Sequence, residues 1–409
     1  SRLIGNTLTG GNGTLANRSV SVPGDIGGEA LGGGGFVAET SATITDSILS
    51  NNTVIGGNGT YVAGTVKGSV GGSASGGGVY VSTSSSGTFT LAIGDSTLSG
   101  NSVQGGSGSG GSATPGFASG GGVYVSDAGK ATVTLVNSTI ASNVAFGGPA
   151  TSTTPVAAGG GLFFGSTTTA TLTNVTVWGN LAEAVVGPNG QGTTSGGGID
   201  NSGGTVTLVN TLMASNGADT GPDFSGAVTN SDHNLLDVAD GSSGFSAAHG
   251  DLIPAPGNVL NPQLGPLANN GGPTQTVALL TGSPAINAGD NSAESVAGPF
   301  DQRGQGFARV VDNTIDIGAY EVQPPPSPPS PPPSPPPRPF PLPTLHVPPL
   351  LGFLDALLGG VETINGNDTE TVTDRFFGIT LFVSTYDSAG DLTSVTFFGF
   401  NVTLLFEMV

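Results

Sequence analysis

Apolar and polar residues alternate along short stretches of the first 220 residues, and one arrangement of them recurs. Each unit contains a glycine triplet, a short apolar stretch, a turn, a longer alternating stretch and a closing asparagine, as in residues 120–145. The run Thr132-Val133-Thr134-Leu135 has a period of two, which is typical of a β-strand. Thr and Val also favour strands, because branching at Cβ suits the pleat. The pattern therefore predicts a protein built from short, repeated strands.

The repeats align in columns. The glycine triplets begin 37 to 44 residues apart, at Gly33, Gly76, Gly120, Gly159 and Gly196. The closing asparagines are Asn6, Asn52, Asn101, Asn143, Asn180 and Asn216. Apolar residues stand three residues before each asparagine and eight residues before all but Asn6, and between them lies a short polar column: Asp46, Asp95, Asn137, Asn174 and Asn210. A fixed motif with variable spacing is typical of a solenoid.

These columns predict an all-β fold, a right-handed parallel β-helix with about three short strands per coil. Stacked coils bring each apolar column into one core, which a single coil cannot bury alone. Glycines permit the tight corners between strands. Asparagine at a corner tolerates a left-handed backbone, and stacked asparagine side chains hydrogen-bond to one another. We therefore interpret the closing asparagines as a structural ladder, and the second polar column likewise.

Composition changes along the chain divide it into four parts. Residues 1–230 contain the coils, 231–323 continue and cap the β-helix, 324–349 form a polyproline II linker, and 350–409 form a small antiparallel β module. The chain opens in the second half of a coil, and no signal peptide is visible. We therefore expect a processed protein or a fragment.

Two regions carry more local expectations. Within the coils, the segments 105–118 and 147–158 are rich in Gly, Ser, Ala and Thr, and we expect them to protrude as loops on one face. In the last part we expect a short helix over 350–360 and alternating strands over 369–386 and 392–406.

The segment 231–321 is expected to close the end of the solenoid, because an open end exposes core and strand edges. Arg303 and Arg309 are the only basic residues between Lys130 and Arg338. They are accompanied in sequence by Asp301, Asp312 and Asp316. We predict a buried Arg–Asp pair that holds this cap together.

Charge and composition narrow the class of protein. The chain has 8 Lys and Arg against 28 Asp and Glu, a net charge of −20. This balance opposes binding to nucleic acid or to anionic membranes, which both depend on basic residues. No apolar run reaches 18 residues, so no membrane-spanning helix is expected. The absence of cysteine removes disulfides and thiol chemistry, and the whole composition suits an extracellular or cell-surface protein.

Two kinds of chemistry compete with a purely structural interpretation. Five acidic residues are weak candidates for a calcium site, although no known calcium-loop motif is present: Asp219, Asp223, Asp232, Asp237 and Asp240. Pectate lyases and polygalacturonases share the β-helix, but their chemistry needs clustered carboxylates on one groove. Amides replace acids at three of five positions in the second polar column, and cations are scarce. We therefore predict no enzyme activity and no required cofactor.

Residues 196–321 also carry recognisable motifs. These are Leu264-Gly-Pro-Leu267, Asn270-Gly-Gly-Pro273, Gly282-Ser-Pro-Ala-Ile286, Ala288-Gly-Asp290, Asp301-Gln-Arg-Gly304 and Asp316-Ile-Gly-Ala-Tyr-Glu321. The region resembles the C-terminal part of bacterial surface β-helix proteins with the choice-of-anchor Q domain. The upstream repeats are similar to those of polymorphic outer-membrane proteins and planctomycete-type β-helices. The resemblance implies an exported bacterial β-helix of adhesive or unknown function, with no catalytic residues to transfer.

Three functions follow as hypotheses. The first is a structural or adhesive protein that assembles with itself head to tail into a fibre, through an apolar C-terminal strand: Phe397, Phe398, Phe400, Val402, Leu404 and Phe406. The second is a monomeric adhesin that binds a surface polysaccharide or another surface protein through the loop face. The third, and least favoured, is a polysaccharide lyase or hydrolase, since the fold alone licenses no activity.

Overall fold

A computed structural model describes two units of the chain, Ser1–Pro325 and Pro326–Val409. In the first it describes residues 1–13, 26–61, 68–83, 87–110, 113–149, 154–184 and 192–324. In the second it describes the backbone of strands at 361–365, 369–376, 379–386, 392–397 and 400–403. The predicted linker beyond residue 324 and the predicted helix over 350–360 lie outside these residues. The predicted all-β fold with long parallel sheets is confirmed.

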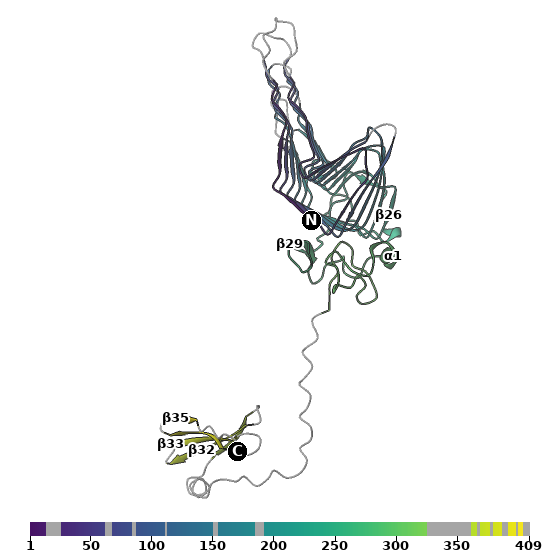
Figure 1. Ribbon diagram of the computed structural model, residues 1–409. Coiled ribbons are helices and arrows are strands. Elements are labelled where there is room, and N and C mark those ends of the chain that lie inside the picture. Colours follow the sequence, from purple (N-terminus) through teal and green to yellow (C-terminus); the bar gives the residue numbers. More distant parts are fainter. Residues whose placement is uncertain are drawn as a thin grey trace. The chain divides into compact units, whose positions relative to one another are not determined.

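The coils of the first unit build four parallel sheets, which we call A to D (Figure 1). Sheet A contains β1 (Arg2–Ile4), β5 (Ala42–Thr45), β6 (Ile48–Ser50), β10 (Thr88–Gly94), β11 (Thr97–Ser99), β15 (Lys130–Ala141), β19 (Thr168–Trp178), β23 (Thr205–Val209), β24 (Leu212–Ala214), β26 (Asn230–Asp232) and β27 (Leu235–Leu236). Sheet B contains β2 (Thr7–Thr9), β7 (Thr53–Ile55), β12 (Ser102–Gln104), β16 (Val144–Gly147) and β20 (Leu181–Ala184).

The other two sheets lie on either side of the glycine triplets along the chain. Sheet C contains β3 (Ala30–Leu31), β8 (Ala74–Ser75), β13 (Ala118–Ser119), β17 (Val156–Ala158) and β21 (Thr193–Ser195). Sheet D contains β4 (Gly35–Ala38), β9 (Val79–Ser82), β14 (Val123–Val125), β18 (Leu162–Phe164), β22 (Ile199–Asn201), β25 (Phe224–Ala227) and β28 (Ser242–Ser243). The expectation of about three strands per coil was therefore too low, because the segment before each triplet adds a strand of its own.

The apolar columns found in the sequence pair in register. Leu98 lies between Leu49 and Ile140 on neighbouring strands, and Ile93 pairs with Leu135 one coil further on. These side chains are at most 2% exposed, and they belong to one core cluster that runs through the coils. Each coil thus covers the apolar residues of the next, as the repeat requires.

The left-handed corners lie one residue away from their predicted place. The residue before each closing asparagine has the positive φ, for example Asn51 at 54° and Ser142 at 55°. The second polar column is also left-handed, from Asp46 at 47° to Asn210 at 49°. The closing asparagine itself is turned inward, with Asn52 and Asn101 fully buried, so its side chain serves the interior rather than the corner.

Sheets B and C lie face to face and form the narrow two-layered extension of this unit in Figure 1. Only small side chains separate the layers: Ala30, Val54, Ala74, Val103, Ala118, Ala145, Ala157 and Ala182. Further out, glycine backbones touch directly. Gly72 donates its N–H to the carbonyl of Gly57 at 2.8 Å, and Gly106 donates to Gly72 at 2.8 Å. The bonds alternate between the layers, so one line of hydrogen bonds joins the two layers together; we call it the glycine line.

Where the structure describes them, the segments expected as loops run as two backbone layers. Residues 105–110 and 113–118 run in the two layers of this extension, as do residues 147–149 and 154–158. They do protrude on one side, but backbone contacts hold them rather than leaving them as free spacers. Glycine is required here because a Cβ at Gly106 would lie 2.0 Å from the carbonyl oxygen of Gly57.

The prediction of an end cap was wrong for residues 261–322, which we call the flank module and which lie along the side of the solenoid. The chain first completes its last coils, with the 3₁₀ helix η1 (Ala247–His249). The flank module then contains the antiparallel pair β29 (Leu264–Ala268) and β30 (Thr276–Leu279), the 3₁₀ helix η2 (Asn291–Ala293) and α1 (Glu294–Ala297).

The flank module packs on the outer side of sheet A: the side-chain NH₂ of Gln302 donates to the Thr97 hydroxyl at 3.0 Å. The N–H of Ala319 donates to the Thr176 hydroxyl at 2.9 Å. The module therefore covers a flank of the solenoid.

The second unit contains one antiparallel sheet. Its strands follow in order: β31 (Val361–Asn365), β32 (Thr369–Phe376), β33 (Ile379–Tyr386), β34 (Leu392–Phe397) and β35 (Phe400–Thr403). The expected single strand over 392–406 is divided, because Phe397 pairs with Phe400 across β34 and β35. Of the predicted assembly strand, Phe397, Phe400 and Val402 lie in these two strands. Phe398, Leu404 and Phe406 lie outside the described residues.

We expect the substitution Gly106→Ala to destabilise the solenoid by about 3 kcal/mol or more, as overpacking against backbone does. The added Cβ would lie 2.0 Å from the Gly57 carbonyl oxygen, and that backbone is itself held in the line of hydrogen bonds. Urea denaturation followed by circular dichroism measures the loss. Gly11→Ala is the matched control, since a Cβ there meets nothing within 4 Å. Equal stability of the two variants would show that the glycine line does not constrain the fold.

Candidate functional site

The closing asparagines form a buried ladder with one direction. The side-chain NH₂ of Asn101 donates to Oδ1 of Asn143 at 2.9 Å, and the backbone N–H of Asn101 donates to the same oxygen at 3.0 Å. Asn143 repeats both bonds to Asn180. Between rungs, each side chain therefore accepts from the asparagine of the coil before it and donates to that of the coil after it. Its NH₂ group also donates to a backbone carbonyl of the coil before, as Asn101 does to Leu49 at 2.9 Å. Bonds of this kind between adjacent members run without a break over the whole column: Asn6, Asn52, Asn101, Asn143, Asn180 and Asn216.

The ladder ends at an aspartate. Asn216 donates to Oδ1 of Asp223 at 2.9 Å, and Oδ2 of Asp223 accepts the backbone N–H groups of Asp237 and Val238 at 2.9 and 3.0 Å. A carboxylate suits this place because both of its oxygens accept. Burial, followed by the adjacent carboxyl of Asp237, raises the pKa of Asp223 well above its ordinary value.

The five candidate calcium ligands lie in different environments. Asp223 and Asp237 are buried together at the ladder end, while Asp219 and Asp240 are exposed. Asp232 instead contacts the neighbouring His233, with 2.6 Å between Oδ1 and Nδ1. In the part of the chain that the structure describes, no group of three or more metal-ligating side chains comes together.

The second polar column ties the coils to the flank module. Asn210 donates to Oδ1 of Asn174 at 2.9 Å, and Asn174 donates to Oδ1 of Asn137 at 3.3 Å. Asn137 then donates to the backbone carbonyl of Ala297 at 3.0 Å. The pKa of Asp95 is raised to about 6, chiefly by burial. The amide side chains of this column therefore connect neighbouring coils to one another and connect the coils to the flank module.

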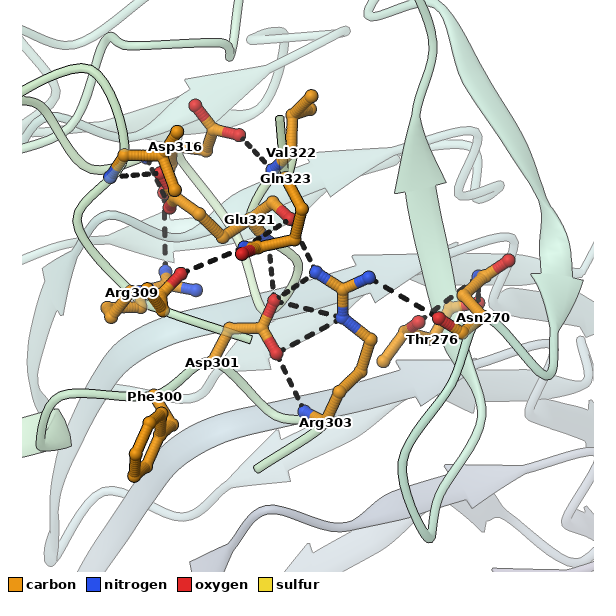
Figure 2. A network of polar contacts seen from close by, with 12 residues as sticks. Asn270, Thr276, Phe300, Asp301, Arg303, Arg309, Asp316, Glu321, Val322 and Gln323 are labelled. Atoms are coloured by element: carbon orange, nitrogen blue, oxygen red, sulfur yellow. Dashed lines mark hydrogen bonds and ion pairs between the residues drawn. The ribbon is translucent and has the colours of Figure 1, made fainter. Parts of the chain in front are cut away.

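Inside the flank module, Figure 2 shows a network around two buried arginines. Arg303 Nη2 lies 2.6 Å from Asp301 Oδ2, and the two side chains are 3% and 0% exposed. The guanidinium lies between two rings, 4.0 Å from the ring centre of Phe307 and 3.9 Å from that of Tyr320. The structure thus contains the kind of buried Arg–Asp pair that the sequence indicated. The flanking rings add cation–π contacts that the sequence did not indicate.

Arg309 has a different partner from the one expected. It is fully buried and contacts the backbone carbonyls of Asp316, at 3.3 Å, and Gly318. Burial lowers the pKa of Arg309, while the carboxyl of Glu321 opposes this shift. Asp312 is exposed and stands outside the network.

Glu321 is the group in this network that sequence reasoning missed, although it closes the motif Asp316–Glu321. It is fully buried, and its carboxyl accepts the backbone N–H groups of Asp316 at 2.9 Å and Val311 at 3.3 Å. Burial, with the nearby carboxyl of Asp316, raises the pKa of Glu321 to about 8. The network holds the module in shape, and its groups are enclosed rather than open to a ligand.

The outer side of sheet D carries the candidate functional site, a column of four aromatic rings that we call the aromatic column: Phe36, Tyr80, Tyr124 and Phe163. Neighbouring rings are stacked with centres 5.3, 5.1 and 4.9 Å apart and planes within 9°. No sequence motif marked this column, because each coil contributes only one aromatic residue to it. That residue stands four positions after the first glycine of its triplet. The first triplet begins at Gly32, not Gly33, since Gly32 has the same left-handed φ as Gly76.

Polar groups stand beside the aromatic column. Burial raises the pKa of Tyr124 to about 12, helped by the neighbouring Tyr80 and by the carboxylates of Asp127 and Glu29. Tyr80 shares a side-chain hydrogen bond with Ser126. Glu29 comes directly before strand β3 of sheet C, and Asp127 follows strand β14 of sheet D. Carboxylates from beside two sheets therefore gather along the rings. The arrangement offers ring edges, hydroxyls and carboxylates along one line.

Comparisons with known proteins give no relative: no family model, curated protein or solved structure matches the chain. The resemblance to choice-of-anchor Q proteins therefore stays an expectation. Among the described residues, no helix has both the length and the apolar character needed to span a membrane.

We expect the stability of the solenoid unit to fall as pH rises from about 4.5 towards 8 and above. The pKa of Glu321 is raised from 4.5 to about 8 on folding, so the folded state binds a proton that the unfolded state releases. This contribution is fully present below pH 4.5 and is lost through pH 8, at no more than about 1.4 kcal/mol per pH unit. Urea denaturation at a series of pH values measures the slope.

The variant Glu321→Gln should flatten this slope, whatever its effect on absolute stability. Glu294→Gln removes an exposed carboxylate from α1 and serves as the control, with the slope unchanged. A wild-type slope retained in full by Glu321→Gln would contradict the assignment.

Proposed function

We propose that this protein is a non-enzymatic structural or adhesive component of a cell surface or extracellular matrix, and that its solenoid, taken as right-handed, is a rigid scaffold for surface contacts. The observation that carries the proposal is the aromatic column with its flanking carboxylates and hydroxyls. Side chains repeated over four successive coils suit a partner that is itself extended and repetitive. We propose a surface polysaccharide as that partner.

The chemistry of contact follows from how the rings stack. Inner rings such as Tyr80 and Tyr124 cover one another's faces, so a ligand meets ring edges rather than ring faces. Tyrosine combines an apolar ring with a polar handle. The carboxylates of Glu29 and Asp127 accept hydrogen bonds from sugar hydroxyls. Such a surface recognises a neutral glycan through many weak contacts rather than through one deep pocket.

The double variant Tyr80→Ala with Tyr124→Ala should bind polysaccharide at least tenfold more weakly, a loss of about 1.4 kcal/mol. Pull-down of the full chain with cellulose, chitin and β-1,3-glucan measures binding. Phe146→Ala removes a half-buried ring from sheet B and is the matched control. Binding that both variants retain would contradict the site, and wild-type protein that binds none of these polymers would contradict the proposed partner.

A second candidate function, self-assembly, rests on a different observation. Among the described strands, β35 lies at the edge of the C-terminal sheet and pairs on one side only, with β34. Its residues include Phe400 and Val402 of the predicted assembly strand. Pairing of this edge with a different strand of the next copy, such as one of its first coil, is a head-to-tail contact that would join solenoids into a fibre.

If this edge drives assembly, the full chain should sediment faster as its concentration rises, whereas Val402→Lys should remain monomeric. Lysine is a residue that protects edges from pairing. Thr373→Lys changes an interior strand, β32, and is the control. Wild-type protein that stays monomeric over the whole concentration range would exclude assembly through β35.

A further inference from the structure

The two halves of sheet A have different surroundings. The flank module covers the half that contains β6, β11 and β24, where even outward residues such as Thr97 and Thr139 are buried. The other half, formed by β5, β10, the first part of β15, the first part of β19 and β23, carries exposed or half-buried outward residues. Its inward neighbours, including Leu91 and Val133, lie in the core. One sheet thus has a covered half and an open half.

The open half presents two columns of threonine side chains, the second interrupted once by Ala92, which we call the hydroxyl face. In-register pairing places Thr132 beside Thr90 and Thr169, and Thr134 beside Thr171. The first column is Thr90, Thr132, Thr169 and Thr205. The second is Thr43, Ala92, Thr134, Thr171 and Thr207.

The hydroxyl face is a regular grid. Neighbouring strands lie about 4.8 Å apart, and residues two apart along a strand lie about 6.7 Å apart. Because Thr is branched at Cβ, its χ1 angle is restricted, so the methyl and hydroxyl groups repeat with the backbone. The core beneath is closed, with Val133 and Leu135 fully buried, which keeps the strands in place.

The hydroxyls at the centre of the grid are free. Across the residues that the structure describes, the hydroxyls of Thr132, Thr134, Thr169 and Thr171 have no hydrogen-bond partner in the protein, unlike Thr97 and Thr139 under the flank module. Neither column contains a charged residue; Lys130 and Asp232 stand only at its margins. A ligand for this face is therefore neutral, and it repeats in two dimensions.

Ordered water has these properties. Waters that hydrogen-bond tetrahedrally at about 2.8 Å place second neighbours about 4.5 Å apart. The same geometry gives a repeat of about 7 Å at right angles to that row. Both distances are close to those of the grid, and each threonine offers a hydroxyl that donates and accepts and a methyl group that excludes loose water.

We propose that the hydroxyl face binds ice. Each threonine contributes little by itself, because water-mediated contacts replace similar contacts with liquid water. The lattice match lets successive coils bind at once, so the contributions add along the solenoid. This inference concerns a different face from the aromatic column and stands independently of polysaccharide binding.

The test is ice-crystal growth in solutions of the full chain, measured as thermal hysteresis and as inhibition of recrystallisation, against albumin at equal concentration. We expect wild-type protein to be active and Thr134→Lys with Thr171→Lys to lose the activity, because two long charged side chains interrupt the centre of the grid. Thr53→Lys with Ser102→Lys makes the same kind of change on the outer side of sheet B and should retain activity. Circular dichroism and melting temperatures establish that each variant is folded.

Two outcomes would overturn the proposal. One is wild-type protein that affects ice growth no more than albumin does. The other is equal activity in the two lysine pairs, which would place any effect elsewhere on the molecule. The Tyr80 and Tyr124 variant should keep full ice activity, so failure of the polysaccharide proposal and failure of this one remain distinguishable.

Discussion

The surfaces of this solenoid depend on the register that its buried asparagine ladder imposes. Asn101 meets Asn143 through both its side chain and its backbone, so a coil that slipped by one residue would lose two buried hydrogen bonds at each neighbour. Leaving such groups unpaired costs about 1–3 kcal/mol each. Because every coil keeps the same rotation, side chains outside the core also line up. The aromatic column and the hydroxyl face are both consequences of this interior alignment.

Sheet A shows how one residue type serves two purposes. Under the flank module, Thr97 and Thr139 are bound to the side chain of Gln302. Outside the covered zone, threonines of the same sheet face outward without a protein partner. The difference comes from the module, whose packing is fixed by the Arg303–Asp301 pair and its two flanking rings. The module therefore decides how much of the sheet remains available.

The repeat itself was predictable from sequence, because its signals are local. Period-two alternation and the recurring asparagines are enough to align Leu98 and Ile140 in one column. The rest depends on contacts between distant residues. Gln302 meets Thr97 across 205 positions, so no local pattern places the module on the flank rather than on the end. The glycine line was interpreted as a series of loops, because the composition of Gly106 and its neighbours is that of a linker as well.

The aromatic column and the role of Asp223 illustrate a second limit. Tyr80 and Tyr124 look like isolated strand residues until the register is known, and the correct register begins at Gly32 rather than Gly33. Asp223 looks like a loop acid in the sequence, whereas its position is set by Asn216 on one side and by backbone N–H groups on the other. Sequence reasoning treated Asp223 as a weak calcium candidate or a solvated loop acid, because no local pattern shows which acceptors the interior needs.

The one-way ladder also has a consequence for how this fold changes length. An asparagine rung accepts on one side and donates on the other, so a duplicated coil with asparagine fits anywhere inside the stack. The aspartate that accepts from the last rung, Asp223, comes from another column, because it aligns with Gly198 of the last glycine triplet. The last rung, Asn216, therefore depends on an acceptor lent by the following turn of chain, so a coil inserted after it would need an asparagine of its own to keep the ladder unbroken.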